Sequence, residues 1–184
     1  MSRLVRMTLL AMISMASTAF AGHVYENLSY GDTRETVTKK LLACPRLEAM
    51  VPETMFGRVG LNGSFKIKKD LNGLKFSLFF DWDETGGLKE VTLRSEDVGP
   101  SDYNSKLKEY YSDASDLITR IYGSPIMSND MPPRKDINPG AIMNSHLWHP
   151  GEGSLMLGVA HAKDKYYVSI RFTSKVIKPV KTEN

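Results

Sequence analysis

The chain has 184 residues, of which 41% are hydrophobic and 24% are charged, with 24 Lys and Arg against 21 Asp and Glu. This length is enough to form a hydrophobic core in one domain or in two small halves. The formal net charge of +3 gives no reason to expect a nucleic acid or an anionic membrane surface as partner. Cys44 is the only cysteine, so an intramolecular disulfide is excluded. We expect a buried thiol, with an intermolecular bridge or a reactive nucleophile as alternatives.

Residues 1–21 have the pattern of a secretory signal peptide. Arg3 and Arg6 precede a short apolar run, and an Ala-Phe-Ala cleavage site follows at residues 19–21. The run is shorter than the roughly 20 residues that a membrane-spanning helix needs, so we expect no membrane span. Cleavage after Ala21 would release a nearly neutral chain into the periplasm or outside the cell. An uncleaved anchor is the alternative.

The rest of the chain repeats one order of elements, a helix followed by three strands. We therefore divide it into a first unit at 22–98, a second unit at 99–175, and a basic C-terminal tail at 176–184 that we expect to be solvated. The predicted fold class is α+β, with two helix-plus-three-stranded antiparallel meander units packed as one layered domain. The pattern leaves open whether the two meanders share one sheet.

The first helix is predicted from its end signals. Asp32 is a candidate N-cap, and Glu35 follows three residues later, as in a capping box. An apolar stripe at helical spacing begins at Val37. Pro45 should end the helix near Ala43, because the residue before a proline avoids helical backbone angles.

Three strands are predicted next, at 63–69, 74–82 and 88–95, because apolar and polar residues alternate there. Asn72-Gly73 favours a tight hairpin turn between the first two. Residues 81–87 join the second and third strands.

Acidic residues gather in that second connection, at Asp81, Asp83 and Glu84. A calcium-binding loop beginning at Asp81 would need a bidentate glutamate at its twelfth position, which is Thr92. We therefore predict a hairpin turn rather than a metal loop or an acid–base pair of carboxylates.

The second unit opens with the clearest helical pattern in the chain. It begins at Ser101 or Asp102, carries an apolar and aromatic stripe, and ends at Gly123. A long loop rich in Pro, Asn and Asp follows at 126–143, and loops of that length are often functional. Three further strands are predicted within 145–174.

His146 and His149 form the closest pair of candidate metal ligands. Residues three apart on a strand point to opposite faces, so we do not expect these two to share a zinc ion. The sequence also lacks a nucleophile elbow, a phosphate-binding glycine loop and a Cys-x-x-Cys pair. We predict no catalytic residue, no metal and no cofactor.

Two motifs carry a family resemblance. The first helix opens with Gly31-Asp32-Thr33-x-Glu35-x-Val37, and the second ends in a Gly-x-Pro followed by a strand with Trp148. In these motifs and in element order the chain resembles the exported modules of the BamE/SmpA and β-lactamase-inhibitor-protein class. The resemblance implies a binding protein: an outer-membrane assembly factor, or an inhibitor that clamps an enzyme with a concave sheet. No residue role is carried over, because the lipid-bearing cysteine of the first group and the disulfides of the second are absent.

We therefore favour a non-enzymatic exported binding module whose partner is another exported or envelope protein. Its candidate protein-binding residues are Trp148, Tyr167 and Arg171, because aromatic and arginine side chains dominate protein interfaces. One alternative is a small exported hydrolase whose site assembles from distant residues, with His146, His149 or Asp81 as first suspects. Another is a structural envelope protein held through the loop at 126–143. The oligomeric state stays open.

Overall fold

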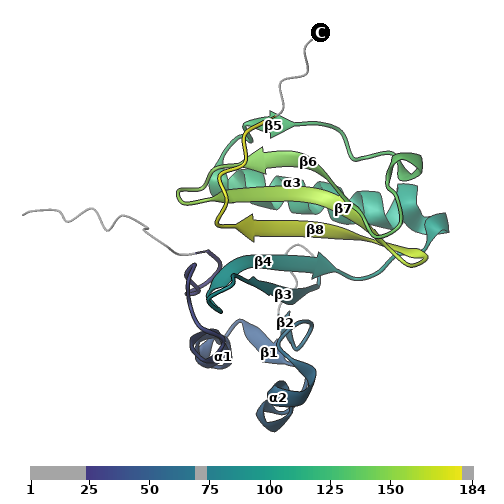
Figure 1. Cartoon of the computed structure of the whole chain (residues 1–184). Coiled ribbons are helices and arrows are strands. Elements are labelled where there is room, and N and C mark those ends of the chain that lie inside the picture. The colour runs from purple at the N-terminus through teal and green to yellow at the C-terminus, as the bar shows by residue number, and fades with distance from the viewer. Residues whose placement is uncertain (1–23, 69–73, 180–184) are drawn as a thin grey trace, which may run out of the picture.

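A computed structural model describes residues 24–68 and 74–179 of the chain, and an eight-stranded antiparallel sheet dominates it (Figure 1). The strand order is β1-β2-β3-β4-β8-β7-β6-β5, so the sheet consists of two meanders joined through β4 and β8. The strands are β1 (Leu47–Ala49), β2 (Phe65–Ile67), β3 (Phe76–Trp82), β4 (Leu88–Ser95), β5 (Met127–Ser128), β6 (Ile142–Trp148), β7 (Ser154–Ala162) and β8 (Lys165–Thr173).

The predicted α+β class with an antiparallel sheet is confirmed, but the predicted layout of two three-stranded meanders is not. Each meander has four strands, because β1 forms between the first predicted helix and the first predicted strand, and β5 forms within the long loop. The two meanders also share one continuous sheet, since Val91 and Leu93 of β4 pair with Phe172 and Ile170 of β8. Both added strands are very short, which explains why their alternation pattern was too weak to detect.

The two predicted helices form in the predicted order, and the structure adds a third, short helix, α2 (Phe56–Val59). The predicted helices are α1 (Arg34–Ala43) and α3 (Lys108–Tyr122), and shorter 3-10 turns lie at Glu53–Met55, Pro100–Asp102 and Arg134–Asp136. The second predicted helix does not begin with a capped α-turn at Ser101 or Asp102. Instead, the 3-10 turn and one π-helical stretch at Tyr103–Leu107 lead into α3. As predicted, α3 ends before Gly123, which has a positive φ of 79°.

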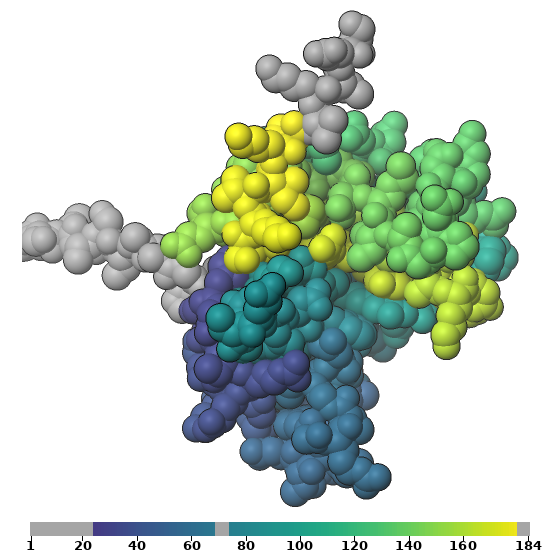
Figure 2. Space-filling view, viewed as in Figure 1, coloured from purple at the N-terminus to yellow at the C-terminus, as the bar shows by residue number. Residues whose placement is uncertain are grey.

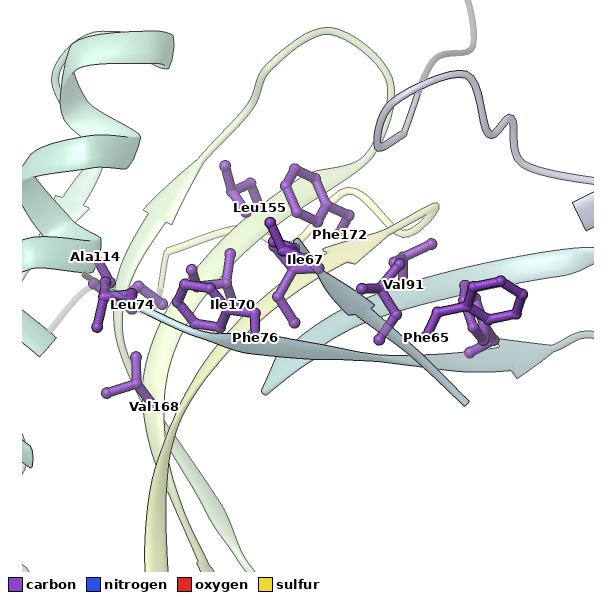
Figure 3. Close-up of a cluster of buried hydrophobic side chains, with 14 of the residues drawn as sticks. Phe65, Ile67, Leu74, Phe76, Val91, Ala114, Leu155, Val168, Ile170 and Phe172 are labelled. Carbon is purple, nitrogen blue, oxygen red and sulfur yellow. The ribbon is translucent and has the colours of Figure 1, made fainter. Parts of the chain in front are cut away.

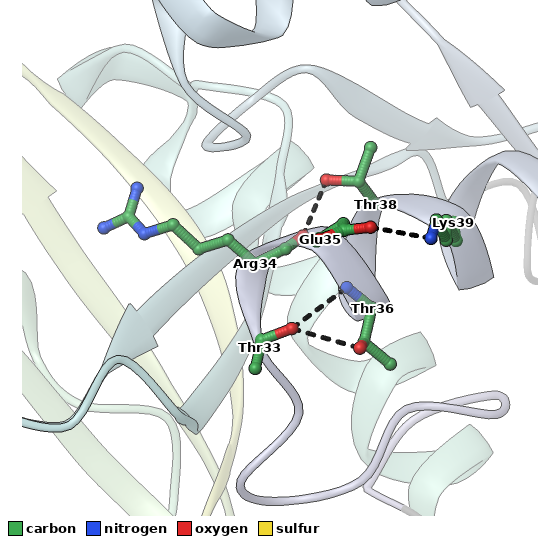
Figure 4. A network of polar contacts seen from close by, with 6 residues as sticks. All are labelled: Thr33, Arg34, Glu35, Thr36, Thr38 and Lys39. Carbon is green, nitrogen blue, oxygen red and sulfur yellow. Dashed lines mark hydrogen bonds and ion pairs between the residues drawn. The ribbon is translucent and has the colours of Figure 1, made fainter.

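The N-terminus of α1 is capped one residue later than predicted. Thr33, not Asp32, is the N-cap, and its hydroxyl accepts a hydrogen bond from the Thr36 amide (Figure 4). Glu35 does not close a capping box, because it pairs with Lys39 one turn along. Asp32 instead accepts from the Ser29 amide and from Lys40, so it anchors the segment that leads into the helix.

The hydrophobic core joins one face of the sheet to the two longer helices. Figure 3 shows part of it, with Ala114 of α3 near side chains of the strands. The core contains Val37 and Leu41 of α1 and Ala114 and Ile118 of α3. The strands contribute the larger share, including Phe65, Ile67, Phe76, Leu78, Val91, Leu93, Leu155, Leu157, Val168, Ile170 and Phe172. Cys44 is a free thiol buried in this core.

We call the sheet face opposite this core the open face. Side chains alternate along a strand, so β4 places Glu90, Thr92 and Arg94 there, and β8 places Tyr167 and Arg171 there. This face is where a sheet residue can meet another molecule.

The C-terminal segment Ser174–Pro179 crosses the open face instead of being solvated throughout. The Ile177 amide donates to the Ser154 hydroxyl at 2.8 Å, and the Ile177 carbonyl accepts from the His149 ring at 2.9 Å. Figure 1 shows this yellow segment passing the start of β7 and the end of β6, and Figure 2 shows it on the surface of the molecule. Leu147 and Met156, which are paired open-face residues of those strands, are buried. The free part of the open face therefore lies around β3, β4 and β8.

Three sequence predictions fall outside the described residues: the signal peptide at 1–21, the turn at Asn72-Gly73, and the last residues of the tail. Across the part of the chain that the structure describes, every helix is too short or too polar to cross a bilayer.

Candidate functional site

A shallow hollow of about 290 Å³ opens on the free part of the open face. Strands β3, β4 and β8 supply most of its lining residues, and Asn62 and Ile142 come from other segments. Its lining combines aromatic, arginine and acidic side chains: Phe79, Asp81, Glu90, Thr92, Arg94, Tyr167 and Arg171.

Arg94 is the central side chain of this hollow. Its guanidinium carbon lies 3.9 Å from the centre of the Tyr167 ring and 5.6 Å from that of Phe79. The same guanidinium donates to Asp97 Oδ1 from Nε at 3.2 Å and from Nη2 at 2.6 Å. The aromatic contacts and the ion pair with Asp97 together hold the Arg94 side chain in one orientation. This lowers the conformational entropy that the side chain would lose on binding a partner.

Arg171 and Glu90 form the second fixed pair of the hollow. Arg171 Nε and Nη2 each donate to one Glu90 carboxylate oxygen, both at 2.8 Å. The Glu90 side chain is only 8% exposed, whereas that of Arg171 is 25% exposed. Thr92 also donates to this carboxylate, at 3.3 Å. The buried charge of Glu90 is thus compensated by Arg171, and the outer edge of the Arg171 guanidinium remains available at the surface.

The structure separates the three residues singled out from the sequence. Tyr167 and Arg171 both line the hollow and are half-buried. Trp148 is 2% exposed in the core on the other face of the sheet, and its indole NH donates to the Gly123 carbonyl at 2.9 Å. Trp148 therefore presents no surface to a partner.

The acidic turn is a hairpin turn, as predicted. The Asp83 carboxylate accepts from the Thr85 amide and hydroxyl and from the Gly87 amide, and the Thr85 hydroxyl bond is the main cause of its lowered pKa. Gly86 supplies the positive φ of 84° that the turn requires. Asp81 points away from this turn and lines the hollow. Among the described residues, no group of three or more His, Cys, Asp or Glu side chains could hold a metal ion.

The two histidines have separate partners. His149 binds the C-terminal segment through the Ile177 carbonyl. His146 is buried against α3, where its two ring nitrogens contact Tyr111 and Ser128. Asp81 lies on the opposite sheet face from His146, so these hydrolase suspects do not form one site.

Arg94 and Phe79 are functional candidates that sequence reasoning missed. Their strands were predicted correctly, and alternation alone places both on the polar side of their strands. The missing information was that β4 pairs with β8, because only this pairing brings Arg94 onto Tyr167.

No family model, no curated protein and no solved structure matches the chain. The residues of the hollow itself define its chemistry. It offers aromatic surface, oriented guanidinium groups and hydrogen-bond acceptors on a rigid sheet, and this set suits recognition of another protein.

Proposed function

We propose that the protein is an exported binding module that recognises another exported or envelope protein through the hollow on its open face. The observation that carries this proposal is the stacking of Arg94 on Tyr167 at 3.9 Å, beside a second arginine, in a surface hollow. Tyrosine and arginine are the residues that most often supply binding energy at protein interfaces.

The partner that fits the hollow is a folded protein with a protruding loop. A volume of about 290 Å³ accommodates a side chain or two, but is at the lower limit for a small-molecule pocket. The two arginines are balanced by Glu90 and Asp81 in the same lining, so a highly charged ligand is not favoured. A loop that inserts an aromatic or aliphatic side chain, with polar groups at its rim, matches this lining best.

The proposal also includes export of the chain and its division into two structural units. The pattern at residues 1–21 supports cleavage after Ala21 and a periplasmic or secreted mature chain. We regard the chain as two helix-plus-meander units, 22–98 and 99–175, that share one sheet, as the resemblance to exported binding modules implies. N-terminal sequencing of the mature protein tests the export. Gly22 as the first residue would support it, and a protein that retains Met1 in the cytoplasmic fraction would contradict it.

Site-specific photo-crosslinking in the producing cell tests the binding surface. A photoreactive phenylalanine derivative at Tyr167 should capture one exported protein, and the added substitution Arg94→Glu should abolish that product. The same derivative at Lys39 on α1, whose side chain is 74% exposed, serves as the control. Identical products from both positions, or none from Tyr167, would refute the proposal.

Affinity measurements with the purified captured protein complete the test. Tyr167→Ala and Arg94→Ala should each weaken binding at least about tenfold, as hot-spot truncations do. Lys39→Ala should leave the affinity unchanged.

A further inference from the structure

A second concave site lies on the helix side of the sheet, far from the open face. It is a groove of about 530 Å³ between α3 and the segment that follows β5. Tyr111, Ser112, Ser128, Asp130 and His146 are among its lining residues. The binding proposal makes no use of this groove, because it rests on the opposite face of the sheet.

Four side chains form a connected hydrogen-bond network in the wall of the groove. Ser128 Oγ lies 3.0 Å from His146 Nε2, and Tyr111 Oη lies 3.0 Å from His146 Nδ1. Tyr111 Oη also lies 2.5 Å from Ser145 Oγ, which contacts the Leu157 carbonyl at 3.1 Å. The strand register explains this arrangement, since Ser128 is the cross-strand neighbour of His146 in the β5–β6 pair.

The carbonyl at one end fixes the direction of every bond in the network. A carbonyl only accepts, so the Ser145 hydroxyl donates to Leu157. The Tyr111 hydroxyl must then donate to Ser145, because two oxygens 2.5 Å apart need a proton between them. Neither hydroxyl then has a proton left for His146, so Nδ1 carries the proton and donates to Tyr111 Oη at 3.0 Å, with Ser145 Oγ as a second acceptor at 3.1 Å.

In the neutral imidazole that tautomer leaves Nε2 as an acceptor, aimed at the Ser128 hydroxyl. Burial lowers the pKa of His146 below its usual 6.5, although Asp130 opposes the shift, so the ring is neutral at pH 7. Ser128 itself is exposed to solvent. A solvent-accessible hydroxyl hydrogen-bonded to an oriented, neutral imidazole is the geometry of an activated serine.

We propose that Ser128 and His146 act as nucleophile and general base in the hydrolysis of small carboxylic esters. Tyr111 has the positioning role that a carboxylate has in a catalytic triad, since its oxygen accepts the Nδ1–H and holds the ring. The groove volume lies within the range of small-ligand pockets. The lining contains two carboxylates, Asp116 and Asp130, and one cation, Lys108, so uncharged esters are favoured over anionic ones.

The reaction has two balanced steps. Ser128 Oγ bonds to the ester carbonyl carbon while its proton moves to His146 Nε2, and that proton then leaves with the alkoxide as the C–O bond breaks. Water next attacks the acyl-Ser128 ester and gives its proton to Nε2. The carboxylic acid departs and the proton returns to Ser128 Oγ, which restores both residues.

Labelling with diisopropyl fluorophosphate tests the nucleophile directly. Mass spectrometry of the treated mature protein should find the adduct on Ser128 within the tryptic peptide of residues 121–134. Ser124 of the same peptide and Ser112 of the same groove should remain unlabelled. An adduct distributed equally over these serines, or none at Ser128, would overturn the proposal.

Hydrolysis of 4-nitrophenyl acetate tests the activity. Ser128→Ala and His146→Gln should each lower the rate by about 100-fold or more, as expected for loss of a nucleophile or a base. Ser124→Ala, an exposed serine four positions away that does not line the groove, is the matched control and should stay within about twofold of wild type. Ser128 is exposed, so its alanine variant should fold normally. A Ser128→Ala protein that retains the wild-type rate would refute the activity.

The pH profile separates positioning by Tyr111 from a purely structural role. The wild-type rate should rise as His146 loses its proton below pH 6.5. Tyr111→Phe removes an oxygen that stabilises the imidazolium, so the midpoint should move to lower pH and the plateau rate should fall. A profile with an unchanged midpoint and plateau would exclude the positioning role of Tyr111.

Discussion

Arg171 donates two hydrogen bonds of 2.8 Å to the Glu90 carboxylate across the junction of β8 and β4. This junction joins the two meanders into one sheet, and the ion pair lies on its open face. Because Glu90 is almost fully buried, its charge depends on Arg171 for compensation.

Removal of Arg171 alone should therefore destabilise the protein more than removal of both partners. We expect Arg171→Met to lower the free energy of unfolding by about 2 kcal/mol, because it leaves a buried carboxylate unpaired. The double variant Glu90→Met, Arg171→Met should lie within about 1 kcal/mol of wild type. Urea denaturation at pH 7 measures both. A double variant less stable than the single one would show that the pair itself contributes net stability.

Truncation of the two aromatic residues singled out from the sequence should lower the stability of the protein by very different amounts. Trp148→Ala should lower the free energy of unfolding by about 3–5 kcal/mol, because it leaves a cavity in the core and removes the hydrogen-bond donor of the Gly123 carbonyl. Tyr167→Ala should lower the free energy of unfolding by less than about 1 kcal/mol, since its half-buried ring stacks on the Arg94 guanidinium outside the core. Thermal and urea unfolding would compare them. Equal losses would mean that Tyr167 is part of the packing.

Gly158 should tolerate no side chain, although it stands in the middle of a strand. A Cβ built there lies 2.3 Å from the Met143 carbonyl oxygen, because the β6 bulge approaches β7 closely. We expect Gly158→Ala to destabilise the protein by about 1–3 kcal/mol. Gly57 in α2 has open space around its Cβ position, so Gly57→Ala should be neutral or slightly stabilising. A circular-dichroism melt of both variants tests this contrast.

Stability should fall between pH 7 and pH 5 in a way that depends on His146. Burial lowers its pKa in the folded protein below 6.5, so the unfolded chain binds more protons in this window. Stability therefore rises with pH there, and it is lost as the pH falls from about 6.5 towards the folded pKa. The urea midpoint of wild type should drop more between these pH values than that of His146→Gln. Parallel decreases in the two proteins would show that His146 is not the cause.

Local signals in the sequence were sufficient for much of the secondary structure. Pro45 ends α1 near Ala43, the hairpin at residues 83–87 forms as predicted, and α3 stops before Gly123. Each of these outcomes depends on backbone angles and hydrogen bonds within a few residues. The N-cap was displaced by one position because Asp32 found more distant partners in Ser29 and Lys40.

The amino-acid sequence by itself determined the α+β class, the order of α1, α3 and the six strands other than β1 and β5, and the residues that alternate between the two faces of those strands. Only the tertiary structure decided which strands are neighbours, because the pair formed by Glu90 and Arg171 spans 81 positions of the chain. That choice buries Trp148, stacks Arg94 on Tyr167, and brings Ser128 to His146. Which distant strands pair depends on the packing energy of the whole core, and a short stretch of sequence does not determine that energy.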